Sequence, residues 1–162
     1  MSAPATAPQP RSAQDQARFE AAVIHLFEHS IRFNELLGLK VTSLRPARGR
    51  IDMRPDLVGH HLSGRLHGGV TSSVLDAIGG LAILLGMAER HPCDTAAQAA
   101  ARFARLGTID LRIDYLRQGL GQHFIASAEV TRLGGRLGSV QMRLVNDEDE
   151  LIATGAASYI VS

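Results

Sequence analysis

The sequence has very little cysteine and lysine, and almost no net charge. Cys93 is the only cysteine, which excludes an internal disulfide, and no cysteine–histidine cluster has metal-ligand spacing. Lys40 is the only lysine, the arginines are scattered, and the formal net charge is +1. This balance argues against a broad nucleic-acid-binding surface. A single cysteine and no signal peptide lead us to expect a cytoplasmic protein.

The length of 162 residues suits one domain with a real core and is too short for two. Residues 1–16 are rich in alanine, proline and glutamine, so we expect a disordered N-terminal arm there. Residues 17–162 then form a single domain. Within it, the segment Val70–Ala88 is almost wholly apolar but holds Asp76 near its middle. An ionised carboxylate is costly in lipid, so this segment is expected to be a buried globular helix rather than a membrane span.

Hydrophobic periodicity predicts the remaining elements. In the C-terminal half, apolar residues alternate with polar ones at Ile109, Leu111, Ile113 and Tyr115. This alternation indicates a strand with one buried face. The expected elements are a helix at 17–37 ended by Gly38, strands at 39–45 and 50–54, a loop at 55–66, the long helix at 67–90, a short helix at 95–106, and four strands between 107 and 161.

The long helix dictates the fold class. A helix that is apolar on all sides must be covered on most of them. Antiparallel strands wrapped around it achieve this cover, so the sequence predicts an α+β domain with an antiparallel sheet around a long central helix.

The start of this helix has an unusual sequence, Gly64-Arg65-Leu66-His67-Gly68-Gly69. Helix N-termini present free backbone N–H groups, and glycine lets a ligand approach them closely. Such a site can hold an anion or polarise a carbonyl group. The same glycine pair is also consistent with a simple tight turn into the helix.

Asp76 is the second candidate for chemistry, as a general base or a nucleophile. The alternative is a structural aspartate that accepts hydrogen bonds. Asp76 lies nine residues after His67, which places it roughly 13 Å along the helix and about half a turn round. One chain therefore cannot easily aim both residues at one substrate atom. Two antiparallel copies of the helix can, so a catalytic role predicts a site shared at a two-fold dimer interface.

The pattern Gly64-x-Leu66-His67-Gly68-Gly69, followed by Asp76, resembles the signature of hotdog-fold acyl-CoA thioesterases of the PaaI-like class. Within that class the chain resembles the YigI-type medium- and long-chain enzymes. The resemblance extends over roughly residues 33 to 162. It includes the segments 108–117, 134–136 and 151–155.

The resemblance implies a hotdog fold and hydrolysis of medium- to long-chain acyl-CoA to free fatty acid and CoA, in fatty acid metabolism. It implies a homodimer or a dimer of dimers (a homotetramer). Coenzyme A is part of the substrate, so no separate cofactor is expected. The alternatives are hydrolysis of an aryl-CoA such as phenylacetyl-CoA, and a non-catalytic module that binds acyl-CoA. A hydratase or dehydratase of the same fold is disfavoured, because its usual motifs are not found.

The resemblance also assigns catalytic roles. The backbone N–H of Gly68 would polarise the thioester carbonyl, with Gly69 beside it and His67 helping to position the substrate. His67 can alternatively serve only to hydrogen-bond its own loop. Asp76 of the neighbouring subunit would attack the thioester or activate water. Thr108 matches a serine or threonine that orients water, although strand alternation places it on the polar face with Asp110.

Substrate binding is expected at four further residues. His61 stands where related enzymes often carry asparagine, and its imidazole can donate a hydrogen bond. Arg117, Arg132 and Arg136 would suit coenzyme A phosphates, or else are solvated surface residues. The histidines near the helix start lack a further ligand, so no metal is expected.

Overall fold

The computed structural model describes residues 10–162, and helix α3 (Gly68–Arg90) runs through its centre. Its 23 residues span about 35 Å. By length and composition α3 could cross a membrane, but 67% of its apolar segment is buried inside the fold. The prediction of a long, buried central helix is confirmed.

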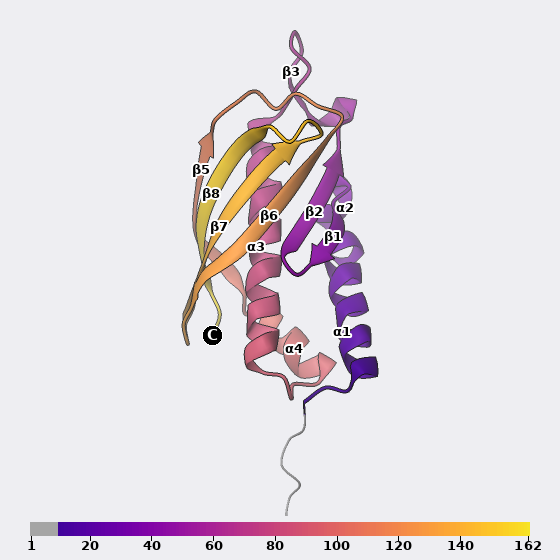
Figure 1. Ribbon diagram of the computed structural model, residues 1–162, viewed down its shortest axis with the longest axis vertical. Helices are drawn as coiled ribbons and strands as arrows, with labels where there is room; N and C mark the ends of the chain where they lie inside the picture. The colour runs from indigo at the N-terminus through magenta and orange to yellow at the C-terminus, as the bar shows by residue number, and fades with distance from the viewer. Residues whose placement is uncertain (1–9) are drawn as a thin grey trace, which may run out of the picture.

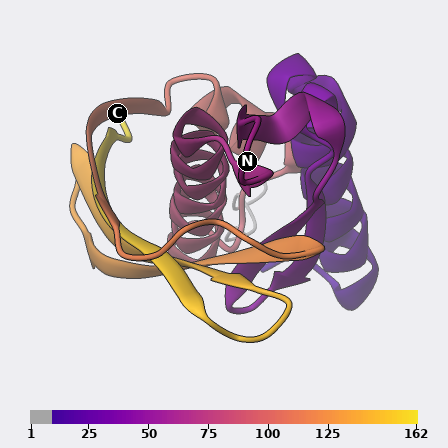
Figure 2. The same cartoon turned by 90° about the horizontal axis from the view of Figure 1, so that it is seen from above.

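A six-stranded antiparallel sheet curls around α3, as Figures 1 and 2 show. The strand order is β1-β2-β6-β7-β8-β5, so β1 and β5 form the two edges. The strands are β1 (Lys40–Leu44), β2 (Ala47–Asp52), β5 (Gly107–Tyr115), β6 (His123–Leu133), β7 (Leu137–Asn146) and β8 (Leu151–Ile160). This architecture confirms the predicted α+β class.

The N-terminal segment covers the side of α3 that the sheet leaves open (Figure 2). It consists of helix α1 (Ala13–His25), the π-helical turn η1 (Leu26–Ser30) and helix α2 (Arg32–Leu37). α1 begins four residues earlier than predicted, because Ser12 caps it by accepting the Asp15 N–H. Residues 13–16 of the predicted disordered arm are therefore helical, and residues 1–9 lie outside the described residues. Gly38 ends α2 in the left-handed conformation, with φ of 71°.

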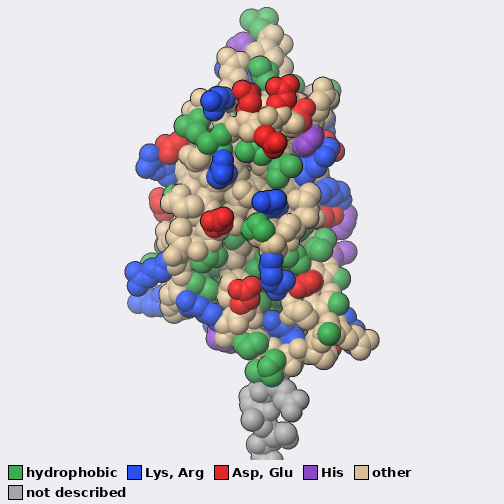
Figure 3. Space-filling view, viewed as in Figure 1, with side chains coloured by type: hydrophobic (Ala, Val, Ile, Leu, Met, Phe, Trp, Pro, Cys, Tyr) green, Lys and Arg blue, Asp and Glu red, His purple; other side chains and the backbone are tan. Residues whose placement is uncertain are grey.

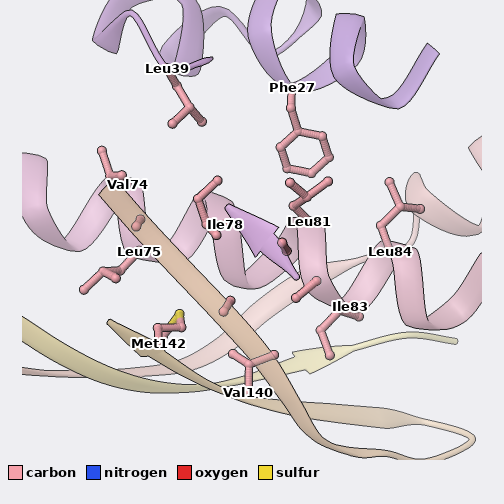
Figure 4. Close-up of a cluster of buried hydrophobic side chains, with 14 of the residues drawn as sticks. Phe27, Leu39, Val74, Leu75, Ile78, Leu81, Ile83, Leu84, Val140 and Met142 are labelled. Carbon is pink, nitrogen blue, oxygen red and sulfur yellow. The ribbon is translucent and has the colours of Figure 1, made fainter. Parts of the chain in front are cut away.

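The core lies between these layers. In Figure 4, Phe27 and Leu39 point towards α3 from the N-terminal side, while Val140 and Met142 face it from β7. All four side chains are buried. The sheet on one side and the N-terminal helical segment on the other together bury the apolar residues that surround α3 on most sides.

The connections differ from prediction in detail. β2 begins at Ala47, three residues earlier than expected, because Leu44 already pairs with Ala47 across a tight turn. The expected loop at 55–66 carries the 3-10 turn η2 (Pro55–Leu57) and a hairpin of β3 (Val58–His60) and β4 (Arg65–Leu66). The predicted helix after α3 is confirmed as α4 (Ala96–Phe103), which Thr95 and Gln98 begin with a capping box.

Candidate active site

Asp76 lies on α3 with its carboxylate held by two hydroxyl groups from the sheet. Thr108 Oγ1 donates to Asp76 Oδ1 at 2.9 Å. The phenol of Tyr159, on β8, lies 3.1 Å from the same Oδ1 and 2.9 Å from the main-chain oxygen of Asp76. Oδ2 accepts no hydrogen bond from any residue that the structure describes. One carboxylate oxygen is thus fixed, and the other remains available for chemistry.

Tyr159 supplies its hydroxyl from a buried position, with 2% of its surface exposed. Burial raises the pKa of the phenol far above its usual range, and the negative charge of Asp76 and the hydrogen bond raise it further. Tyr159 therefore keeps its proton and remains a donor to the carboxylate.

A β-bulge brings Thr108 to this site. Thr108 pairs with Tyr159 and Asp110 pairs with Ser158, which leaves Ile109 as an extra residue in β5. The extra residue shifts the alternation, so Thr108 faces α3 instead of the polar surface. The strand pattern expected from sequence is therefore wrong at Ile109, which was expected on the buried face and is 56% exposed, whereas Leu111 and Ile113 pack against the core as expected.

Two consecutive glycines of α3 have different roles beside Asp76. A methyl group at Gly79 would collide with the Tyr159 hydroxyl and would lie 2.8 Å from Met142 Sδ. Gly79 is thus required for close packing of α3 on β8. A methyl group at Gly80 would lie 3.9 Å from its nearest neighbours, so Gly80 has room beside it.

The start of α3 leaves one backbone donor free. His67 caps the helix: its Nδ1 accepts the Gly69 N–H at 2.9 Å, and its carbonyl accepts the N–H groups of Val70 and Thr71. The Gly68 N–H is the one amide of this turn without an acceptor among residues 10–162. A free N–H at a positive helix end can stabilise a developing oxyanion.

A second tyrosine fixes the peptide next to this donor. Tyr115 donates its hydroxyl hydrogen bond to the Gly68 carbonyl at 2.9 Å. The Gly68–Gly69 peptide is therefore held at its carbonyl by Tyr115 and at its N–H by His67. In the neutral His67 ring the proton then lies on Nε2, because Nδ1 is an acceptor.

The two halves of the predicted site are separate within one chain. Gly68 and Asp76 are eight residues apart on α3, about 12 Å along its axis. A pocket of about 300 Å³ contains Asp76 and Thr108, and a second of about 420 Å³ contains His67 and Gly69. The two pockets meet at Phe33 and Ser73 of the same chain.

The residues expected to bind substrate do not converge in one chain. His61 lies at the turn of the β3–β4 hairpin, which projects from one end of the molecule (Figure 1), and its ring stacks on that of His60. Arg117 lies beside the start of β8, where it donates to the Leu151 carbonyl at 3.1 Å. Arg132 and Arg136 lie at the β6–β7 turn beside the other end of β8, roughly 30 Å away along the strand.

Charged side chains, and side chains that could bind a metal, are also dispersed over the described part of the molecule. Figure 3 shows side chains of both signs scattered over one face of the molecule. No group of three or more metal-ligating side chains occurs within the described residues.

A family model of the thioesterase superfamily matches residues 63–153, a range that holds the His67 turn, Asp76 and Thr108. The chain belongs to the thioesterase superfamily. The sheet wrapped around α3 is accordingly the hotdog fold, as the resemblance implied.

Two relatives of the chain carry the same name. The medium/long-chain acyl-CoA thioesterase YigI of Salmonella typhimurium is 34% identical over 138 residues, which cover 84% of this chain and 89% of the relative. YigI of Escherichia coli strain K12 is 33% identical with the same coverage. A solved structure from Shewanella oneidensis, described as related to the thioesterase superfamily, is 37% identical with a TM-score of 0.87, over 93% of this chain and 100% of that one.

Sequence reasoning missed both tyrosines of the site. Tyr159 lies in the closing strand, and no sequence motif links it to Asp76. Tyr115 belongs to the strand segment that resembles the family, but its bond to Gly68 depends on how β5 packs near the end of α3.

Proposed function

We propose that this protein hydrolyses medium- to long-chain acyl-CoA thioesters to free fatty acid and CoA, in a site shared between two copies of the chain. The observation that carries the proposal is the state of Asp76: Thr108 and Tyr159 orient one carboxylate oxygen, and the other is free beside an apolar pocket. The similarity to the YigI thioesterases supports acyl-CoA as the substrate class.

The free Oδ2 can act in the reaction as a nucleophile or as a general base. It can attack the thioester carbonyl carbon directly, or it can take a proton from a water molecule that attacks instead. In both routes the carbonyl oxygen becomes an oxyanion, the C–S bond breaks, and the CoA thiolate leaves and takes up a proton. In the direct route, water then releases the acid from Asp76. The Gly68 N–H of the other copy would stabilise the oxyanion.

The edge strand β5 supports a shared site. It forms one edge of the sheet, and its exposed apolar side chains include Ile109 and Tyr115, with Leu116 directly after it. Exposed apolar side chains along an edge strand favour pairing with another chain. Pairing through β5 would bring a second copy next to Thr108 and Asp76. A dimer is then the minimal active unit, and a dimer of dimers is compatible with it.

The direct test is release of free thiol from acyl-CoA substrates of two to eighteen carbons, with phenylacetyl-CoA as an aryl comparison. We expect hydrolysis of the medium and long chains, and loss of most turnover in Asp76→Asn with the fold intact by circular dichroism. No release from any substrate contradicts the proposal. Tight binding without turnover favours a binding module, and a preference for phenylacetyl-CoA favours the aryl alternative.

A further inference from the structure

The pocket beside Asp76 has a polar part and a larger apolar part. Its volume is about 300 Å³. Asp76, Thr108 and Tyr159 contribute the polar groups already described, together with Ser73 and Asn34. The apolar side chains are Phe27, Ile31, Phe33, Ala77, Phe103 and Leu106. A carboxylate that opens onto an apolar space fits a ligand with a reactive carbonyl and a hydrocarbon tail.

Two elements far apart in the sequence contribute aromatic rings to the wall of this pocket. Phe27 comes from η1, and Phe103 is the last residue of α4. Their rings meet edge to face, with centroids 5.7 Å apart. Both rings line the pocket and contact each other, so they form one continuous part of its wall.

The position of Phe103 is fixed by the segment between α3 and β5. Thr95 and Gln98 cap the start of α4 reciprocally. Arg102 Nε donates to Asp94 Oδ2 at 2.6 Å, which ties the end of the helix to the loop before it. The wall that Phe103 provides is therefore a defined part of the fold.

We infer that this pocket binds the acyl chain and that the Phe27–Phe103 pair sets its upper length, so that the preferred substrates are medium-chain thioesters. The inference rests on the proposed function and narrows it. A volume of about 300 Å³ is at the lower end of the ~300–1,000 Å³ range of small-molecule pockets, which suits a medium chain better than a long one.

Gly80 allows the pocket to be made smaller without damage to the fold. A methyl group there meets Leu106 and Tyr159 only at 3.9 Å, an ordinary contact distance. Alanine also has a higher helix propensity than glycine. Gly80→Ala and Phe103→Ala therefore change the same pocket in opposite directions.

The test compares kcat/KM for octanoyl-, dodecanoyl- and hexadecanoyl-CoA. We expect the wild type to prefer the two shorter chains. Each additional methylene of the acyl chain that becomes buried raises kcat/KM roughly fourfold. Room for two more methylenes in Phe103→Ala therefore raises its hexadecanoyl-to-octanoyl ratio of kcat/KM by roughly 15-fold. Gly80→Ala lowers that ratio. Arg105→Ala is the matched control, because Arg105 is exposed just after α4 and does not line this pocket, so its ratio stays at the wild-type value.

Binding of the same three ligands to Asp76→Asn, alone and combined with each pocket variant, is measured by calorimetry. This readout separates the two proposals: no thiol release by the wild type defeats the proposed function, while chain-length dependence of binding still tests the pocket. A wild-type preference for hexadecanoyl-CoA overturns the inference. So does an unchanged ratio in folded Phe103→Ala and Gly80→Ala. If Phe103→Ala fails to fold, the Gly80→Ala ratio decides alone.

Discussion

The phenol oxygen of Tyr159 contacts Asp76 at two points, the side-chain Oδ1 at 3.1 Å and the main-chain oxygen at 2.9 Å. A single hydroxyl on β8 thus fixes both the carboxylate and the turn of α3 that carries it. Gly79 makes the contact possible, because any side chain there would meet the Tyr159 hydroxyl. The helix, its glycine and the last strand together determine where the Asp76 carboxylate points.

Tyr159→Phe should lower kcat by roughly 10- to 100-fold with little change in KM, because a hydrogen bond to a charged group is lost while the acyl pocket keeps its shape. Steady-state thiol release measures both constants. Thr108→Val should act in the same direction, and Thr108→Ser, which keeps the hydroxyl, should retain most activity. An equal loss in Thr108→Ser and Thr108→Val would show that the hydroxyl is not what matters.

The raised pKa of Tyr159 predicts an alkaline loss of stability. In the unfolded chain the phenol titrates near its ordinary pKa of about 10, whereas burial keeps it protonated in the folded protein. Above pH 10 the unfolded state releases this proton and the folded state does not, so the free energy of unfolding falls as pH rises. The stabilising contribution is complete below pH 10.

Urea denaturation of the wild type and Tyr159→Phe between pH 8 and pH 11 measures this effect. The variant lacks the phenol, so above pH 10 the wild type should lose about 1.4 kcal/mol per pH unit more than the variant does. Parallel pH profiles for the two proteins would contradict the burial of a neutral phenol at this position.

The elements that local pattern determines could be predicted from sequence. The almost wholly apolar sequence of α3 marked it as the central helix, and His67 with its two glycines marked where it starts. In β7, Val140, Met142 and Leu144 alternate with Gln141 and Arg143, as in a strand with one buried face, and all three are buried. In β7 the period of the hydrophobic residues alone decides which face is covered.

The parts that depend on long-range packing could not be predicted. The bulge at Ile109 adds one residue to β5 without a sequence signal, and it alone turns Thr108 towards Asp76. Likewise, nothing local to Tyr159 indicates that its hydroxyl reaches α3. The arginines were grouped by their chemistry, but strand order places Arg117 at the opposite end of β8 from Arg136.

The neighbouring glycines of α3 should respond differently to alanine. Gly79→Ala forces a methyl group against Tyr159 and Met142, so overpacking should cost about 1–3 kcal/mol, partly offset by the higher helix propensity of alanine. Gly80→Ala should be neutral or up to ~1 kcal/mol more stable. Urea denaturation at neutral pH gives both values. Equal stabilities of the two variants would mean that α3 does not pack on β8 as closely as described.

Gly68→Pro removes the free amide proposed to stabilise the oxyanion while keeping the helix. Gly68 is the first residue of α3, where proline is tolerated, and His67 before it has the extended backbone that proline requires, with φ of −66° and ψ of 136°. We expect kcat to fall by roughly 10²- to 10³-fold. Gly68→Ala retains the N–H, and its methyl group meets Tyr115 only at 3.5 Å, so it should stay near wild type. Similar kcat values for both variants would place the oxyanion donor elsewhere.

A mixture of two inactive variants tests whether the site is shared. Asp76→Asn and Gly68→Pro each inactivate every site of their own homodimer. In a mixed dimer, one site receives both defects and the other receives neither. Random re-association of equal amounts after unfolding and refolding should therefore restore roughly a quarter of wild-type turnover. A mixture of Asp76→Asn and Asp76→Ala is the control, because both variants lack the same carboxylate and every site of their mixed dimer is defective. Its turnover should remain at background. Background turnover in the first mixture, despite mixed dimers detected by two affinity tags, would mean that Gly68 and Asp76 of one chain do not serve different sites.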